Sequence, residues 1–139
     1  MSNLQKEVQT KLTKGFLDLI VLQFIDSQPM HGYQIITKIR RSFGVYLGPS
    51  TVYPLLTSLE KKGYVTSQWN MNSERPRKVY KLTNEGHTML NFTANSLTLM
   101  CKRIVKDTTA TVELSGPETS RSAIGHQKRV PAALAALQP

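Results

Sequence analysis

The pattern of apolar and polar positions predicts four helices and a β-hairpin between residues 13 and 106. The most apolar stretch, FLDLIVLQFI at 16–25, has apolar residues around nearly its whole helical circumference. Such a helix belongs at the centre of a core rather than on its surface, and Thr13 is placed to cap its N-terminus. Pro29 and Gly32 then interrupt the helical pattern.

A second helix is predicted from about residue 32 to residue 43, with Gly44 placed to end it. Its polar positions, which include a lysine and two arginines, fall on the side that we expect to face solvent. The side that we expect to be buried carries Tyr33, Ile35, Ile36 and Ile39.

The stretch GPSTVYPLLTSLEKKGYV, residues 48–65, predicts a third helix that ends at Gly63. Its apolar residues keep a helical spacing, so one side is buried. Pro54 is expected within the first turn, where a missing N–H costs little. The other side carries hydroxyl groups, a tyrosine and lysines but little else: Ser50, Thr51, Tyr53, Thr57, Ser58, Lys61 and Lys62.

A hairpin with a positively charged tip is predicted over residues 64–82. Residues 64–69 alternate as a strand does, and residues 78–82 form the returning strand. The intervening loop, NMNSERPR, is rich in turn-forming and basic residues.

A fourth helix follows, and Thr83 is its predicted cap. Apolar residues recur along it at steps of four and three, the pattern of a helix that packs along another helix. We therefore expect a dimer interface formed by Leu90, Ala94, Leu97, Cys101 and Ile104. The predicted organisation is a helical and hairpin domain over residues 1–82, a dimerisation helix over 83–106, and a disordered tail over 107–139, which is rich in small residues.

The charge of the chain points to a polyanionic partner. The formal net charge is +9, and residues 1–106 contain 15 of the 18 Lys and Arg residues but only 6 of the 9 acidic ones. The excess positive charge therefore lies on the part predicted to fold, which favours nucleic acid or an anionic membrane surface.

Other classes of function find little support in the sequence. There is no glycine-rich phosphate loop, no nucleophile with its base and no pair of carboxylates in a motif, so we expect no enzyme, no catalytic residue and no cofactor. The three histidines lack partners at metal-ligand spacing, so no metal site is expected. The apolar stretch at 16–25 is too short to cross a membrane, no signal peptide is evident, and the single cysteine agrees with a cytoplasmic location.

Three helices followed by a basic hairpin is the order of a winged helix-turn-helix domain. The small residues Ser50 and Thr51 would let the third helix approach the major groove closely. Tyr53, Thr57 and Lys61 lie along its outward side, where they could reach bases or backbone. The hairpin tip, with Arg75, Arg77 and Lys78, could lie against the flanking minor groove or phosphates.

Three linked stretches, HGYQI, STVYPLLTSLEKKGYV and RPRKVYKLTNEG, resemble the signature of the PadR family of transcriptional regulators over roughly residues 13–104. The resemblance implies a mainly α fold with a small β-hairpin: a winged helix-turn-helix domain followed by one C-terminal dimerisation helix, as in the compact subgroup. It also implies a homodimer that represses transcription at a two-fold double-stranded DNA operator and responds to a small-molecule effector.

The resemblance also implies roles for individual residues. The recognition helix corresponds to Ser50, Thr51, Tyr53 and Pro54, with Lys61 near its end. The wing corresponds to residues 75–78, and Tyr33 matches a position near the DNA backbone. Glu74 departs from the family pattern, because many relatives have glycine before the Arg-Pro-Arg of the wing. An acid at this tip should weaken contact with phosphate.

Two further functions are compatible with the pattern. A winged helix can be a protein-interaction module, which would bind a protein without dependence on salt and would have little affinity for duplex DNA. It can also be an architectural DNA-binding protein, which would share the salt dependence of a regulator but not its sequence preference.

Overall fold

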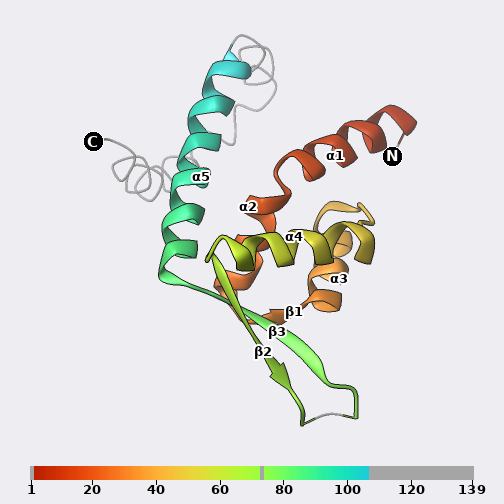
Figure 1. The fold of residues 1–139 in the computed structure, drawn as a ribbon. Coiled ribbons are helices and arrows are strands. Elements are labelled where there is room, and N and C mark those ends of the chain that lie inside the picture. The colour runs from red at the N-terminus through yellow and green to blue at the C-terminus, as the bar shows by residue number, and fades with distance from the viewer. Residues whose placement is uncertain (1, 73, 107–139) are drawn as a thin grey trace, which may run out of the picture. The chain divides into compact units, whose positions relative to one another are not determined.

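The computed structural model describes residues 2–72 and 74–106, which form five helices and a three-stranded antiparallel sheet (Figure 1). The predicted tail, 107–139, lies outside the described residues. The mainly α fold with a small β-hairpin is confirmed. In chain order the elements are α1 (Asn3–Gly15), α2 (Leu17–Ser27), β1 (Met30–His31), α3 (Gly32–Phe43), α4 (Pro49–Lys61), β2 (Val65–Asn70), β3 (Arg77–Leu82) and α5 (Asn84–Ile104).

The chain divides into two compact units, Met1–Asn91 and Phe92–Pro139, and the boundary falls inside α5. The first unit contains α1 to α4, the sheet and the beginning of α5. Its core is built on α2, as the apolar pattern predicted, and on the inward sides of α3, α4 and the sheet. The most deeply buried side chains are Val21, Leu22, Ile35, Ile39, Val52, Leu56, Leu59 and Val65.

The prediction that Thr13 caps the central helix is wrong. Thr13 lies inside α1, is buried, and its hydroxyl donates a hydrogen bond to the carbonyl of Gln9 at 2.7 Å. The cap belongs to α1 instead: the Ser2 hydroxyl accepts from the N–H of Gln5, whose side chain accepts from the N–H of Ser2. A turn at Phe16 then separates α1 from α2.

The predicted helix ends are confirmed. Gly44 and Gly63 have φ of 68° and 82°, the left-handed conformation that glycine adopts without strain just past a helix. Thr83 caps α5, because its hydroxyl accepts from the N–H of Gly86 at 3.0 Å. The same hydroxyl donates to the carbonyl of Gly63 at 2.6 Å, so this cap also joins the start of α5 to the end of α4.

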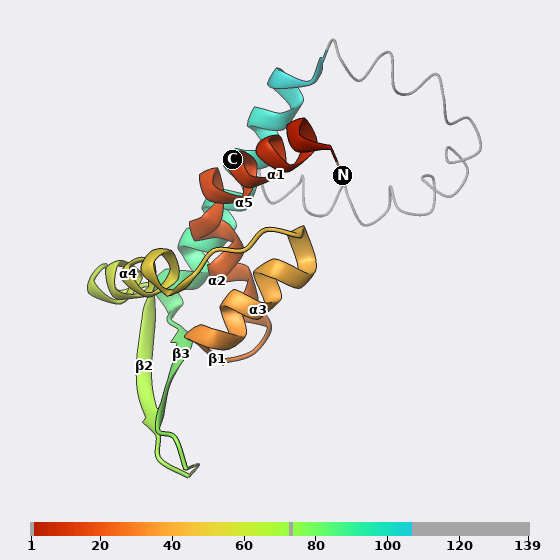
Figure 2. The same cartoon turned by 90° about the vertical axis from the view of Figure 1, so that its right-hand side faces the viewer.

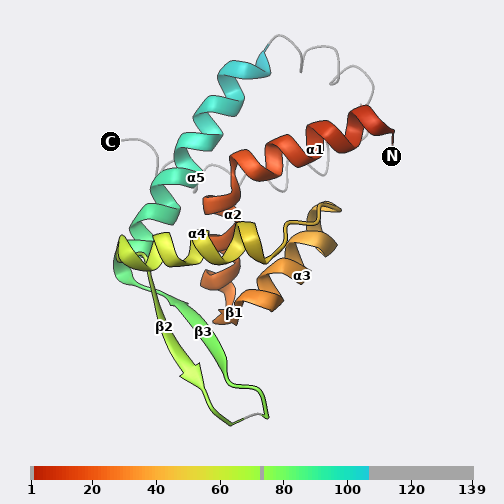
Figure 3. The ribbon, with the colours of Figure 1, turned by 45° about the vertical axis from the view of Figure 1, so that its right-hand side comes forward.

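The sheet contains one strand more than the predicted hairpin. Its order is β1-β3-β2, with Met30 opposite Tyr80 and His31 opposite Val79. The β2–β3 hairpin, or wing, projects beyond the helices of the first unit, as Figures 2 and 3 show from two further directions. Because β1 leads directly into α3, the third strand ties the first turn of α3 to the wing.

Candidate nucleic-acid interface

The exposed side of α4 carries most of the residues predicted to read DNA. Val52, Leu56 and Leu59 turn into the core, which leaves the opposite side of the helix open. Thr51 lies off this side and is half-buried. The exposed members, called the α4 face below, are Ser50, Tyr53, Pro54, Thr57 and Lys61.

Pro54 does not occupy the first turn of the helix, as was predicted. The first residue of α4 is Pro49, so Pro54 is the sixth residue and lies inside the helix. A proline there cannot donate to the carbonyl four residues earlier, which belongs to Ser50. The α4 face therefore carries a main-chain acceptor without its helical donor, beside the Ser50 hydroxyl.

A hollow lies between the start of α3, the α4 face and the wing. Tyr33 from α3, Tyr53 from α4 and three wing cations line it, so one surface gathers predicted DNA-contacting residues from three elements. Tyr33 is 68% exposed, which corrects its expected burial and agrees with a surface role. The remaining lining residues are His31, Trp69, Arg75, Pro76, Arg77, Lys78 and Tyr80.

Lys78 of the wing is paired with an acid of α4. Its ammonium Nζ lies 3.5 Å from Glu60 Oε1, while the hydroxyl of Ser67 donates to Glu60 Oε2 at 2.5 Å. The Ser67 hydrogen bond and then Lys78 hold the pKa of Glu60 below its ordinary value, against an opposing effect of burial. Glu60 therefore stays charged and links the end of α4 to both strands of the wing.

Arg77 of the wing contacts the cap of α3. Its guanidinium nitrogen lies 3.0 Å from Nε2 of His31, whose Nδ1 accepts from the N–H of Gln34 at 3.3 Å. Burial, and then the charge of Arg77, lower the pKa of His31. A neutral imidazole has a single acceptor nitrogen, so in either tautomer only one of these two contacts is a hydrogen bond.

Sequence reasoning missed His31, Trp69 and Tyr80 as members of this surface. His31 is brought to the wing by β1, and the only sequence signal was its place beside Gly32 in the HGY motif. Trp69 lies on β2 and is 59% exposed.

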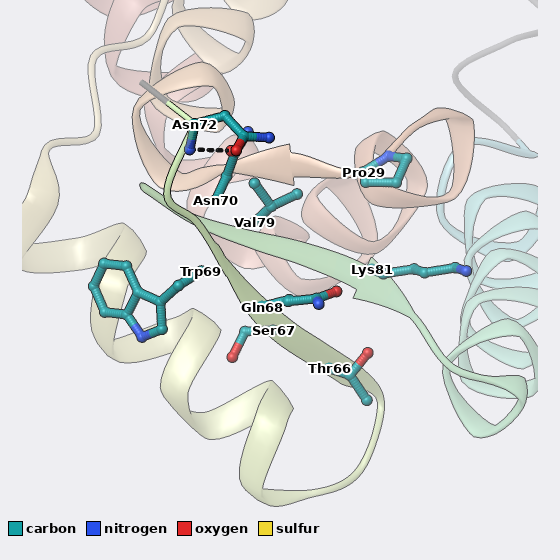
Figure 4. Close-up of a pocket in the computed structure, with 9 residues that line it drawn as sticks. All are labelled: Pro29, Thr66, Ser67, Gln68, Trp69, Asn70, Asn72, Val79 and Lys81. Carbon is teal, nitrogen blue, oxygen red and sulfur yellow. Dashed lines mark hydrogen bonds between the residues drawn. The ribbon is translucent and has the colours of Figure 1, made fainter. Parts of the chain in front are cut away.

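A second hollow, shown in Figure 4, is lined by β2 and β3 together with Pro29. Its lining is mostly uncharged, with Thr66, Gln68 and Asn70 from β2, and Asn70 accepts from the N–H of Asn72 at 3.0 Å. Lys81 is the one cation among these lining residues. The hollow beside the α4 face has the greater positive charge and is the better match to a polyanion.

The predicted dimer seam is divided between core and surface. Leu90 is only 5% exposed and belongs to the core of the first unit. Ala94 and Leu97 in the second unit are half-buried, whereas Cys101 is exposed and Ile104 is 70% exposed. The part of the seam available to a second subunit therefore begins at Ala94.

Within residues 2–72 and 74–106, no group of three or more His, Cys, Asp or Glu side chains is arranged to hold a metal ion. In the same ranges no helix has the length and apolar character needed to cross a membrane.

Comparison with known proteins agrees with the geometry. Residues 21–91 match the Transcriptional regulator PadR-like family. A PadR family transcriptional regulator from Eggerthella lenta is 29% identical, with a TM-score of 0.65 over 69% of this chain and 84% of that chain. A transcriptional regulator from Clostridium thermocellum is 26% identical, with a TM-score of 0.63 over 69% of this chain and 96% of that chain. A PadR-like transcription factor from Bacteroides fragilis is 26% identical, with a TM-score of 0.60 over 70% of this chain and 95% of that chain.

Proposed function

Because the chain belongs to the PadR-like family of transcriptional regulators, its function is DNA-binding regulation of transcription, and we propose that it acts as a homodimeric repressor. The observation that carries this proposal is the convergence of the α4 face and the wing cations on one surface. The proposal includes a two-fold operator, a small-molecule effector and a cytoplasmic location, which the family resemblance supports.

The α4 face would enter the major groove. Ser50, Thr57 and Tyr53 offer hydroxyl groups, and Lys61 offers a positive charge toward bases or phosphates. Gly48, the residue before the helix, provides no side-chain cap. The N–H of Ser50 therefore lacks a side-chain acceptor and, at the positive end of the helix dipole, can donate to a phosphate oxygen.

The wing would lie along the flanking backbone or minor groove. Arg75 and Arg77 supply positive charge there, with Lys78 at the start of the returning strand. Tyr33, exposed at the first turn of α3, would donate its hydroxyl to a backbone phosphate. These contacts orient the protein on the duplex, whereas the α4 face supplies the sequence preference.

Dimerisation would use the part of the α5 seam outside the core of the first unit, Ala94, Leu97, Cys101 and Ile104. The first unit has a separate apolar stripe on α1, where Leu4, Val8 and Leu12 are 69%, 47% and 52% exposed. Exposed apolar residues at such helical spacing are typical of a surface that packs on another helix.

Replacing Leu97 with Asp tests the dimer, and replacing Asn95 with Asp is its matched control. Both residues are half-buried on α5, but Asn95 lies on another side of the helix. Sedimentation should show monomers for Leu97→Asp and dimers for the control. A stable Leu97→Asp dimer would refute this interface.

Fluorescence anisotropy tests DNA binding, using duplex DNA from the region upstream of the protein's own gene, a scrambled duplex and two salt concentrations. A specific regulator binds the first duplex more tightly, and its affinity falls steeply with salt. Equal binding to both duplexes would indicate architectural binding. Absence of binding at low salt would favour a protein-interaction module. Operator-dependent inhibition of transcription in vitro would then establish repression.

A further inference from the structure

Gly32, the first residue of α3, is a glycine for reasons of space. Among the described residues, only Gly44 and Gly63 have a positive φ, so the backbone at Gly32 is open to any residue type. A Cβ atom built on Gly32 would lie 2.4 Å from Cε1, 2.6 Å from Cζ and 2.8 Å from the hydroxyl oxygen of Tyr53. These separations are well inside van der Waals contact.

The phenol end of Tyr53 therefore packs directly on the main chain of α3. Tyr53 belongs to the α4 face, so its ring joins the recognition helix to the first residue of the preceding helix. The ring is 41% exposed and lines the hollow together with His31 and Tyr80. Its hydroxyl thus has a defined place on the surface proposed to bind DNA.

We propose that Gly32 is a positioning residue for DNA binding, because its lack of a side chain seats the Tyr53 ring on the α3 backbone. This inference rests on the proposed function and assigns a role in DNA binding to a residue that does not belong to the α4 face or the wing. A seated ring has already lost its rotational freedom in the free protein, so binding incurs a smaller ordering cost. The packed position of the Tyr53 ring also determines which DNA atom or base edge its hydroxyl can reach.

An added methyl group at Gly32 should move Tyr53 without unfolding the protein. The three atoms that it would meet all belong to the far end of a side chain that can rotate away. Gly86 shows the contrary case, since a Cβ there would lie 2.1 Å from the main-chain oxygen of Tyr64. Backbone cannot move aside so easily, so we expect a side chain at position 86 to disturb the fold and a side chain at position 32 to disturb only the surface proposed to bind DNA.

The first test is Gly32→Ala, with Gly15→Ala as the matched control. Gly15 is also helical, and a Cβ added there would meet no atom within 4 Å beyond its chain neighbours and the backbone of its own helix. Gly32→Ala should keep the melting temperature of the wild type, since alanine favours helix, and should weaken operator binding about tenfold, the size of one lost base or backbone contact. The control should bind as the wild type does.

The second test places Gly32→Ala in a Tyr53→Ala background. If Gly32 acts through the Tyr53 ring, the double variant should bind no more weakly than Tyr53→Ala alone. Aromatic NMR signals of Tyr53 in the free protein should shift in Gly32→Ala but not in Gly15→Ala.

Three results would overturn the inference: wild-type affinity in Gly32→Ala, additive losses in the double variant, or a large loss of thermal stability in Gly32→Ala. Failure of the wild-type protein itself to bind duplex DNA would instead refute the proposed function, so the two failures are distinguishable.

Discussion

The α4 face and the wing are both proposed to contact DNA, but they differ in how their polar groups are occupied in the free protein. On α4, the side chains of Ser50 and Lys61 have no hydrogen-bond or ion-pair partner within the described ranges. On the wing, Lys78 is paired with Glu60 and Arg77 contacts His31. Ser50 and Lys61 can contact DNA without giving up an internal contact, whereas the two wing cations must exchange an internal partner for DNA.

This difference affects how much each region contributes to binding. A half-exposed ion pair such as Lys78–Glu60, with side chains 39% and 33% exposed, adds only about 0–1 kcal/mol to stability. Breaking it is therefore easy, but the exchange still reduces the net gain from a phosphate contact. The same internal contacts also restrain the wing before DNA binds. They therefore make the wing more rigid but leave less of its positive charge available to phosphates.

The largest expected effect comes from an acid in the middle of the α4 face. Thr57→Glu should weaken operator binding by about 2 kcal/mol or more, roughly thirtyfold, because a carboxylate would face the phosphates. Thr57 is exposed and glutamate favours helix, so the melting temperature should not fall. Thr57→Gln is the neutral control. Anisotropy titrations should separate the two variants, and equal affinities would exclude the α4 face from the interface.

The helices α3 and α4 were predictable because their signals are local. Apolar residues at helical spacing marked their buried sides, and Gly44 and Gly63 marked their ends. Strand β1 was not predictable in this way, since its two residues are too few to show alternation and it exists through pairing with β3. The first helix, α1, was not predicted because its apolar residues are exposed and do not form a buried side.

The candidate site was predictable in its residue types but not in its pairings. Tyr53, Thr57 and Lys61 followed from their common side of one helix. The contacts that occupy the wing join residues far apart in the chain: His31 and Arg77 are separated by 46 positions. Which cation meets which partner depends on the register of the sheet, and no local pattern specifies that register.

The second prediction compares lysines from the two regions by the salt dependence of binding. Lys61→Met should reduce the slope of log affinity against log salt by about 0.9, the value for one phosphate contact. Lys78→Met should reduce it less, because Glu60 already neutralises this lysine. Titrations of both variants over a range of salt concentrations measure the difference.

Glu60→Gln sharpens the same comparison. It should free Lys78 and steepen the salt slope, and adding Lys78→Met should reverse that gain. If Glu60→Gln raises affinity equally with and without Lys78, the acid acts through its long-range charge alone. The pairing of the wing would then have no effect on DNA binding.

The smallest expected effect is a change in how stability depends on pH when His31 is replaced. Burial and Arg77 hold the pKa of His31 below its ordinary value of 6.5. As pH falls below that value, the unfolded chain takes up a proton that the folded protein still refuses, so the free energy of unfolding decreases. This loss continues until pH reaches the lowered pKa of the folded state.

His31→Asn removes this titration but keeps the helix cap, because an asparagine oxygen can accept the N–H of Gln34 as Nδ1 does. Denaturant unfolding at several pH values between about 7.5 and 5 should show that the free energy of unfolding decreases less on acidification in His31→Asn than in the wild type. The other described histidine, His87, is present in both proteins, so its contribution cancels. Superimposable pH profiles would mean that burial and the charge of Arg77 do not lower the pKa of His31 in the folded protein.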